Sequence, residues 1–240
     1  MDMTHYTVKA NLARPLRFAF VSDLHDTDNP PILAAIEKQQ VDAVLVGGDF
    51  IHNNTVYQRG LDFLQLAADR GPVFAVLGNH EKRFRRDIRQ LVRQTGARLL
   101  DNEFAPFEEI WIGGLTSGYG DGGHDKLNEQ TPPPQTDWLE EFAAQSGFKL
   151  LLNHHPEYYE PYLQNSGVDL IVSGHAHGGQ WRFFGRGVFA SGQGLFPKYD
   201  AGIFTDGETN MIVSRGIGNS LFPFRVNNRP EVILIQLKTG

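Results

Sequence analysis

Residues 16–25 read Leu-Arg-Phe-Ala-Phe-Val-Ser-Asp-Leu-His, an apolar run that passes directly into Asp23 and His25. The apolar part, Leu16–Val21, is too short for a helix and rich in Phe, Leu and Val, so it predicts a buried strand. Four similar runs predict further buried strands, at Ala43–Val46, Val73–Leu77, Leu150–Leu152 and Leu170–Val172.

Stretches with helical spacing of apolar residues lie between the early strands, at Pro31–Gln40, Tyr57–Arg70 and Phe84–Gln94. Pro31 suits a first helical turn, and the glycines at positions 71 and 96 suit C-terminal caps. This alternation of strands and helices predicts an α/β fold in which parallel strands pair and helices pack outside them.

After residue 97 the predicted strands outnumber the helices. Strands are expected at Arg98–Leu100, Ile110–Ile112, Gly187–Ala190, Met211–Ser214 and Glu231–Leu237. The later helices are expected at Thr136–Ser146 and Glu157–Asn165. This excess of strands favours a second, more antiparallel sheet. No linker separates the halves, so residues 1–240 are expected to form a single domain.

Composition excludes several classes of protein. The formal net charge is −6, which argues against a nucleic-acid-binding patch. The chain has no cysteine, which excludes disulfides, thiolate metal sites and a cysteine nucleophile. No window approaches the roughly 18–20 apolar residues of a membrane segment. We therefore expect a soluble, cytoplasmic protein, while its oligomeric state stays unknown.

Side chains that can bind metal follow five of the predicted strands. They are Asp23, His25, Asp49, Asn79, His154, His175 and His177. We expect the five strands to belong to one sheet and these side chains to share its carboxyl edge, where open α/β sheets bind ligands. The two histidines of Gly-His-Ala-His at 174–177 are expected to point the same way from an extended backbone.

Each cluster alone has a structural alternative. Asp-Leu-His at 23–25 and Gly-Asp at 48–49 are ordinary turn sequences. Asn79 could cap a helix, and His154-His155-Pro156 could be a simple strand end. Their shared position after five strands favours a metal centre over coincidence.

This donor set suits divalent cations bound by nitrogen and oxygen, such as Mn, Fe, Zn, Ni or Mg. Seven ligands are too many for one tetrahedral site, but they suit two sites that share a carboxylate. Two ions about 3.5–4 Å apart form the clamp used for in-line displacement at phosphorus. The pattern therefore predicts two divalent ions that act on an anionic phosphate ester.

The chain resembles the calcineurin-like metallophosphoesterase superfamily in five motifs, which occur in the family's order: Asp23-Leu24-His25, Gly48-Asp49, Gly78-Asn79-His80-Glu81, His154 and Gly174-His175-Ala176-His177. The resemblance implies the metallo-dependent phosphatase fold, a four-layer sandwich of two mixed β-sheets flanked by helices. It implies a first ion held by Asp23, His25 and His177, a second held by Asn79, His154 and His175, and Asp49 as the bridge. It also implies that His80 is catalytic and assists the leaving group.

The chain is also similar to the branch of bacterial phosphodiesterases of the YkuE and YaeI type, through Gly174–Gln180, Lys198–Gly202 and Val213–Gly218. Members of that branch often begin with a membrane segment and this sequence shows none, which makes membrane attachment and lipid-linked substrates less expected here. His52 stands where many relatives carry an acid that orients the catalytic histidine. We expect Glu81 or the backbone to orient His80 instead.

These features predict hydrolysis of a small-molecule phosphate ester, with a phosphodiesterase as first choice and a metal-bridging hydroxide as nucleophile. A phosphomonoesterase, a nucleotide pyrophosphate hydrolase and a catalytically inactive phosphate- or partner-binding module are the alternatives. The stretch Gly118–Gln135 is rich in Gly, Asp and Pro and contains His124. Long loops of this kind are often functional, so we expect it to form part of the substrate rim.

Overall fold

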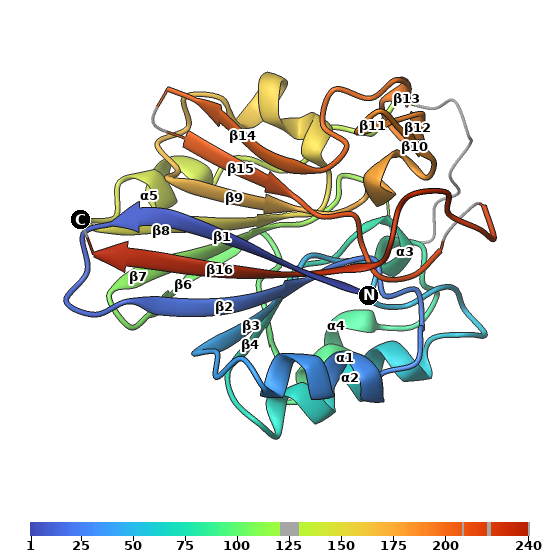
Figure 1. Ribbon diagram of the computed structural model, residues 1–240. Helices are drawn as coiled ribbons and strands as arrows, with labels where there is room; N and C mark the ends of the chain where they lie inside the picture. Colours follow the sequence, from blue (N-terminus) through green and yellow to red (C-terminus); the bar gives the residue numbers. More distant parts are fainter. Residues whose placement is uncertain (121–129, 208, 220–221, 240) are drawn as a thin grey trace.

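The computed structural model describes residues 1–120, 130–207, 209–219 and 222–239. Two sheets lie face to face, and helices cover their outer faces (Figure 1). In spatial order the first sheet contains β1 (Asp2–Ala10), β16 (Glu231–Thr239), β2 (Leu16–Val21), β3 (Ala43–Val46), β4 (Val73–Ala75) and β5 (Arg98–Leu99). The second contains β14 (Gly202–Asp206), β15 (Thr209–Val213), β9 (Leu170–Ser173), β8 (Phe148–Asn153), β7 (Ile110–Leu115) and β6 (Glu103–Phe107).

The helices form the two outer layers (Figure 1). The outer face of the first sheet is covered by α1 (Pro30–Glu37), α2 (Gln58–Ala68) and α4 (Ile88–Gln94). The outer face of the second is covered by α5 (Leu139–Ala143), η1 (Pro156–Tyr158) and η2 (Tyr159–Leu163). The predicted four-layer α/β fold is thereby confirmed.

Strand β2 shows why the central strands are apolar throughout. Side chains alternate across a strand, so its two faces meet different neighbours. Phe18 and Phe20 lie in the apolar cluster between the two sheets. Ala19 and Val21 lie in the cluster beneath α1, α2 and α4. Because both faces are buried, a continuous apolar run replaces the polar alternation of a surface strand.

Among the described residues, the second sheet has two antiparallel strand pairs and the first has one, so the second is the more antiparallel sheet that the sequence suggested, although its central strands are parallel. Strands β7, β8, β9 and β15 all pair in parallel. Only the outermost pairs, β6 with β7 and β14 with β15, are antiparallel. The connections over the outer face are short or irregular helices, so they lack the long helical period that would have revealed parallel pairing.

Several predicted helices and strands differ from the observed ones in type or in bounds. The helix expected over Glu157–Asn165 is a 3-10 turn followed by a π turn, because Pro161 cannot donate the hydrogen bond that an α-helix requires. The helix expected from Phe84 begins at Ile88, where the Asp87 side chain accepts a hydrogen bond from the Gln90 amide at 3.0 Å. Of the residues 136–146 that were expected to be helical, only those of α5 form an α-helix. The strand expected over 187–190 is split between two hairpins, β10 (Arg182–Phe183) with β11 (Arg186–Gly187) and β12 (Phe189–Ala190) with β13 (Gly194–Leu195).

Three strands that the sequence analysis missed, β1, β6 and β14, are edge strands of the two sheets. Strand β1 pairs in parallel with β16 from Asp2 to Ala10, so segments near the two ends of the chain lie side by side. Its residues alternate between polar and apolar, which weakens the apolar signal that marks a central strand. Among the described residues, no helix has the length and apolarity needed to cross a bilayer. The single-domain organisation stays a prediction.

Candidate metal centre

The seven metal-capable side chains come from both sheets, which corrects the expectation of one sheet. Asp23, Asp49 and Asn79 follow β2, β3 and β4 of the first sheet. His154 and His175 follow β8 and β9 of the second. The backbone N–H of His175 donates to both Asp23 carboxylate oxygens at 3.1 Å, which joins the two sheets at this edge. The sequence could not reveal this division, because both sheets end their parallel strands at the same side.

Asp23, His25 and His177 form a first buried donor group. The Nε2 atoms of His25 and His177 lie 3.1 Å apart, and Asp23 Oδ1 lies 3.5 Å from His177 Nε2. Burial holds the pKa of His25 well below its ordinary value and lowers the pKa of His177 to about 4. Both rings are therefore neutral, which is the form that binds metal.

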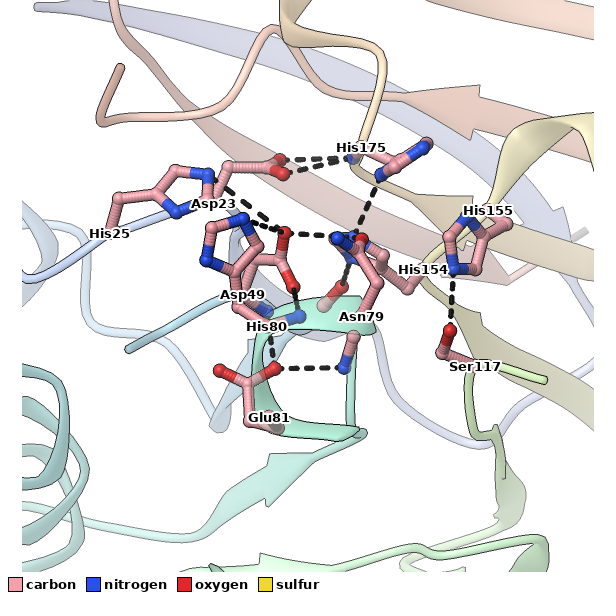
Figure 2. Close-up of polar contacts among 12 residues, drawn as sticks. Asp23, His25, Asp49, Asn79, His80, Glu81, Ser117, His154, His155 and His175 are labelled. Atoms are coloured by element: carbon pink, nitrogen blue, oxygen red, sulfur yellow. Dashed lines mark hydrogen bonds and ion pairs between the residues drawn. The ribbon is translucent and has the colours of Figure 1, made fainter. Parts of the chain in front are cut away.

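Asn79, His154 and His175 form a second donor group. His154 Nε2 lies 3.1 Å from Asn79 Oδ1 and 3.2 Å from His175 Nδ1. The other ring nitrogen of His154, Nδ1, donates to the Gly47 carbonyl at 2.8 Å, since a carbonyl only accepts. That bond aims Nε2 into the centre, as outer hydrogen bonds do for histidine ligands in metal sites. Figure 2 shows these side chains pointing toward one another.

Asp49 lies between the two groups. Its Oδ2 atom is 3.3 Å from His154 Nε2 and 3.9 Å from His25 Nε2. Its Oδ1 atom accepts a hydrogen bond from the His80 amide at 2.9 Å, which fixes the carboxylate. Burial alone would raise the pKa of Asp49, but the neighbouring His154 and His80 rings hold it well below its ordinary value. A charged carboxylate in this position can be shared by two cations.

The donor set fits divalent metal. Within each of the groups Asp23–His25–His177 and Asp23–Asp49–His154, one ligand atom per residue lies within 4.8 Å of the others. The Nε2 atoms of His25 and His177 face each other at 3.1 Å, where they can share one N–H, whereas a cation can accept a lone pair from both. Nitrogen and oxygen donors without thiolate match the hard and borderline divalent ions.

His155 is not equivalent to its neighbour His154. Its Nε2 atom lies 2.8 Å from the Ser117 hydroxyl (Figure 2). Its Nδ1 atom lies 3.2 Å from Glu157 Oε1. Although its ring also lies near those of His154 and His175, both of its nitrogens have protein partners. This geometry supports the choice of His154 as the ligand.

A left-handed backbone aims most of the predicted ligands. Positive φ angles occur at Asp23 (53°), His25 (43°), Asp49 (51°), His175 (62°) and His177 (46°). Such strain costs about 1–3 kcal/mol per residue and gathers at functional sites. The expectation of an extended Gly-His-Ala-His segment is therefore wrong. The turn sends His175 to the second group and His177 to the first.

His80 lies at the entrance to the centre. Its ring nitrogen Nδ1 hydrogen-bonds to the backbone carbonyl of His52, and its Nε2 lies 3.9 Å from Asp49 Oδ2. Because Nδ1 donates its hydrogen bond to this carbonyl, Nε2 faces the centre. Glu81 and the backbone were the two groups expected to orient His80, and it is the backbone that makes this contact. The carbonyl belongs to His52, the residue that stands where many relatives carry an acid.

Glu81 stabilises the loops that carry Asp49 and Asn79. Its buried carboxylate accepts hydrogen bonds from the amides of Asp49 at 2.7 Å, Ile51 at 3.0 Å and Gly78 at 2.9 Å. Burial and the nearby Asp49 charge raise the pKa of Glu81 to about 8, against the effect of these donors. Glu81 thus positions Asp49, and within the described part of the chain no hydrogen bond joins its side chain to that of His80.

Glu81→Gln should therefore destabilise the metal-free protein by about 3 kcal/mol, because an amide cannot accept all three bonds and places its own N–H against a donor. Urea unfolding of the EDTA-treated protein measures this loss. Exposed Glu103→Gln is the matched control and should leave the midpoint unchanged. Equal midpoints for the two variants would contradict the role given to Glu81.

Two residues near the centre were missed in the sequence. Arg225 Nη2 lies 3.2 Å from His177 Nδ1, and burial lowers the pKa of this guanidinium to about 10. Glu157 Oε1 lies 3.8 Å from His175 Nε2. Arg225 is 48 positions from His177 in the chain, and no local motif marks it. Only the tertiary fold places these side chains at the centre.

A family model of the calcineurin-like phosphoesterases matches residues 16–179. These residues contain all five strand ends described above and more than half of the chain. The chain belongs to the calcineurin-like phosphoesterase family, and it is a hydrolase of phosphate esters. The predicted family and reaction class are confirmed.

Individual relatives agree with this assignment. The chain is 28% identical to Phosphodiesterase YaeI of Escherichia coli strain K12, over 94% of this chain and 83% of that protein. It is 23% identical to the uncharacterized metallophosphoesterase YkuE of Bacillus subtilis strain 168, over 100% and 86%. A solved structure, TT1561 of Thermus thermophilus, superposes with a TM-score of 0.51 at 13% identity, over 84% of this chain and 89% of that one. The last likeness concerns the fold alone.

Proposed function

We propose that this chain is a phosphodiesterase that uses two divalent metal ions. The observation that carries the proposal is the position of Asp49, whose Oδ2 atom faces His154 at 3.3 Å and His25 at 3.9 Å, one residue from each donor group. Such a shared carboxylate is typical of a two-metal clamp. The name of the similar protein YaeI supports a diester as the substrate class.

In this proposal Asp23, His25 and His177 would hold one ion, and Asn79, His154 and His175 would hold the other. When bound, the ions would activate water and neutralise the charge that develops on the phosphate. Asp49 would be shared by both ions. Glu81 fixes the loop that carries Asp49, and the Gly47 carbonyl fixes the His154 ring. In its imidazolium form, with Nδ1–H bonded to the His52 carbonyl, His80 would give its Nε2 proton to the leaving oxygen and return to the neutral ring.

The substrate class is tested with the metal-reconstituted protein and three compounds. They are bis(p-nitrophenyl) phosphate, p-nitrophenyl phosphate and a nucleotide pyrophosphate. We expect the highest kcat/KM on the diester. Faster cleavage of the monoester or of the pyrophosphate would replace the phosphodiesterase by one of the alternatives. Failure on all three, with metal bound, would favour the inactive binding module.

Metal should stabilise the fold strongly, because the buried donors converge and a cation satisfies them together. Mn²⁺ at about 100 times its Kd should add about 2.7 kcal/mol, or roughly 5–10 °C in Tm. Differential scanning fluorimetry before and after EDTA measures the shift, and elemental analysis should find two ions per chain. His177→Ala should reduce the shift, whereas exposed His5→Ala should not. An unchanged Tm would count against a metal centre here.

The rim formed by Gly118–Gln135 stays a prediction, since residues 121–129, with His124, lie outside the described residues. Its two ends do lie beside the centre. The Gly118 amide donates to the Tyr158 hydroxyl at 3.0 Å, and the Thr131 hydroxyl donates to Glu157 Oε1 at 2.6 Å. Deleting residues 121–129 should change KM on the diester and leave metal content intact. An unchanged KM would remove the loop from the proposed site.

A further inference from the structure

Large apolar side chains are exposed at one corner of the molecule, on the hairpins β10–β11 and β12–β13 and the segment after residue 222 (Figure 1). We call this set the aromatic patch. It consists of Phe183 (52% exposed), Phe184 (106%), Leu195 (70%), Phe196 (73%) and Phe224 (56%). Singly exposed apolar residues are ordinary on a protein surface, whereas a group of this kind marks an interaction site.

The patch is continuous. The Phe196 amide donates to the Val188 carbonyl at 2.8 Å, and the Val188 amide donates to the Trp181 carbonyl at 2.9 Å, which ties the two hairpins together. The Trp181 ring stacks on Phe224 with centroids 6.0 Å apart. The patch also adjoins the metal centre, since Gln180, three residues after His177, donates from Nε2 to the Phe224 carbonyl at 2.9 Å.

Two of the phenylalanines stand in an unfavourable backbone conformation. The φ angles of Phe184 and Phe196 are 52° and 54°, in the left-handed region that Gly and Asn prefer. At the tip of β10–β11, Phe184 precedes Gly185, where a tight hairpin turn would favour Asn. Neither ring gains burial in return, because both project into solvent. Packing within this chain therefore gives no reason for phenylalanine at these two positions.

Charge indicates what the patch contacts. Residues 181–199 contain Arg182, Arg186 and Lys198 and no Asp or Glu, in a chain with net charge −6. Arg182 pairs with Asp200 and Lys198 with Glu160, but Arg186 at the hairpin tip has no ion pair among the described residues. Arg225, next to Phe224, bonds inward to the Arg215 and Gly218 carbonyls, and Arg229 pairs with Asp2 at 3.8 Å. The unpaired charge beside the exposed rings is therefore the positive charge of Arg186, which favours anionic groups.

We infer that the aromatic patch docks this chain onto the surface of an anionic lipid bilayer. The Phe184 and Phe196 rings are exposed, so they can enter the interfacial layer, while Arg186 faces the lipid phosphates. A second copy fits less well, since a two-fold contact through this patch would bring the two unpaired Arg186 side chains together. Docking in this way would place the His177 side of the metal centre toward the membrane.

Vesicle co-sedimentation tests the inference, with phosphatidylcholine alone and with phosphatidylcholine mixed with phosphatidylglycerol. We expect binding to the anionic vesicles, weakened by added NaCl. The double variant F184N/F196N should bind at least about tenfold more weakly, since two buried rings are lost. Asn suits the left-handed backbone, so this variant should fold with an unchanged or higher Tm. The control Ile203→Thr changes an exposed apolar residue (43%) on β14 and should bind like the parent.

Arg186→Gln should weaken binding to the anionic vesicles and leave any binding to phosphatidylcholine unchanged. The inference is overturned if the parent chain ignores both vesicles, or if F184N/F196N binds as well as Ile203→Thr. It is also overturned if sedimentation velocity shows a parent dimer that F184N/F196N abolishes, because the patch would then join two copies. Vesicle binding is measured without substrate, so failure of the phosphodiesterase proposal would not affect this test.

Discussion

Asp49→Asn is expected to abolish the diesterase activity, with a loss of at least about a thousandfold in kcat/KM. The carboxylate faces both donor groups, with Oδ2 at 3.3 Å from His154 and 3.9 Å from His25. An amide keeps the size of the side chain but removes the negative charge that two cations would share. It also leaves the buried His154 without the partner that, against the effect of burial, raises its pKa to about 10.

The variant should also bind fewer than two ions per chain, which elemental analysis measures after dialysis. Asp101→Asn is the matched control. Asp101 lies outside both donor groups, where it contacts Arg89 at 2.5 Å and Thr116 at 2.7 Å. This control should bind two ions and keep most of the activity. Full metal content and activity in Asp49→Asn would refute the shared carboxylate.

His80→Asn is expected to lower kcat by about 10²–10⁴ on a diester with an alkyl leaving group. It should lower kcat far less on bis(p-nitrophenyl) phosphate, because nitrophenolate departs without a proton. His80 is not in either donor group, so both ions should remain bound. Equal losses on the two esters, or loss of metal, would remove His80 from the role of acid.

His52→Asn separates the two means of orienting His80. The contact to His80 Nδ1 comes from the backbone carbonyl of His52, which an asparagine retains. The His52 ring itself lies 5.7 Å from the His80 ring between centroids. His52→Asn should therefore reduce kcat on the alkyl ester much less than His80→Asn. A comparable loss would show that the imidazole of His52 takes part.

The candidate ligands could be predicted from the sequence because each one follows its strand closely. Strand β2 ends at Val21 and β3 at Val46, so Asp23 and Asp49 fall at the same edge whatever the rest of the chain does. Buried parallel strands have continuous apolar runs, and these runs stand out in a sequence. The family, the phosphoesterase chemistry and the identity of the candidate ligands could thus be predicted locally.

Other features depend on contacts between distant segments. Nothing near β8 reveals that it belongs to a different sheet from β2, because strand pairing is decided by long-range burial. His175 and His177 reach different donor groups because the backbone has positive φ angles at both residues. The neighbouring Gly174 and Gly178 permit this turn but do not require it.

The amino-acid sequence by itself determined which donors this protein offers and in what order, since a strand end is a local feature. Only the tertiary structure decided how they divide into two groups, because it brings the carboxyl edges of two sheets together at the Asp23–His175 contact. It also decided that a backbone carbonyl orients His80 and that Arg225 reaches His177. Every residue has a backbone carbonyl, so the sequence cannot show which carbonyl orients His80. The contact between Arg225 and His177, 48 positions apart, exists only once the sheets have packed.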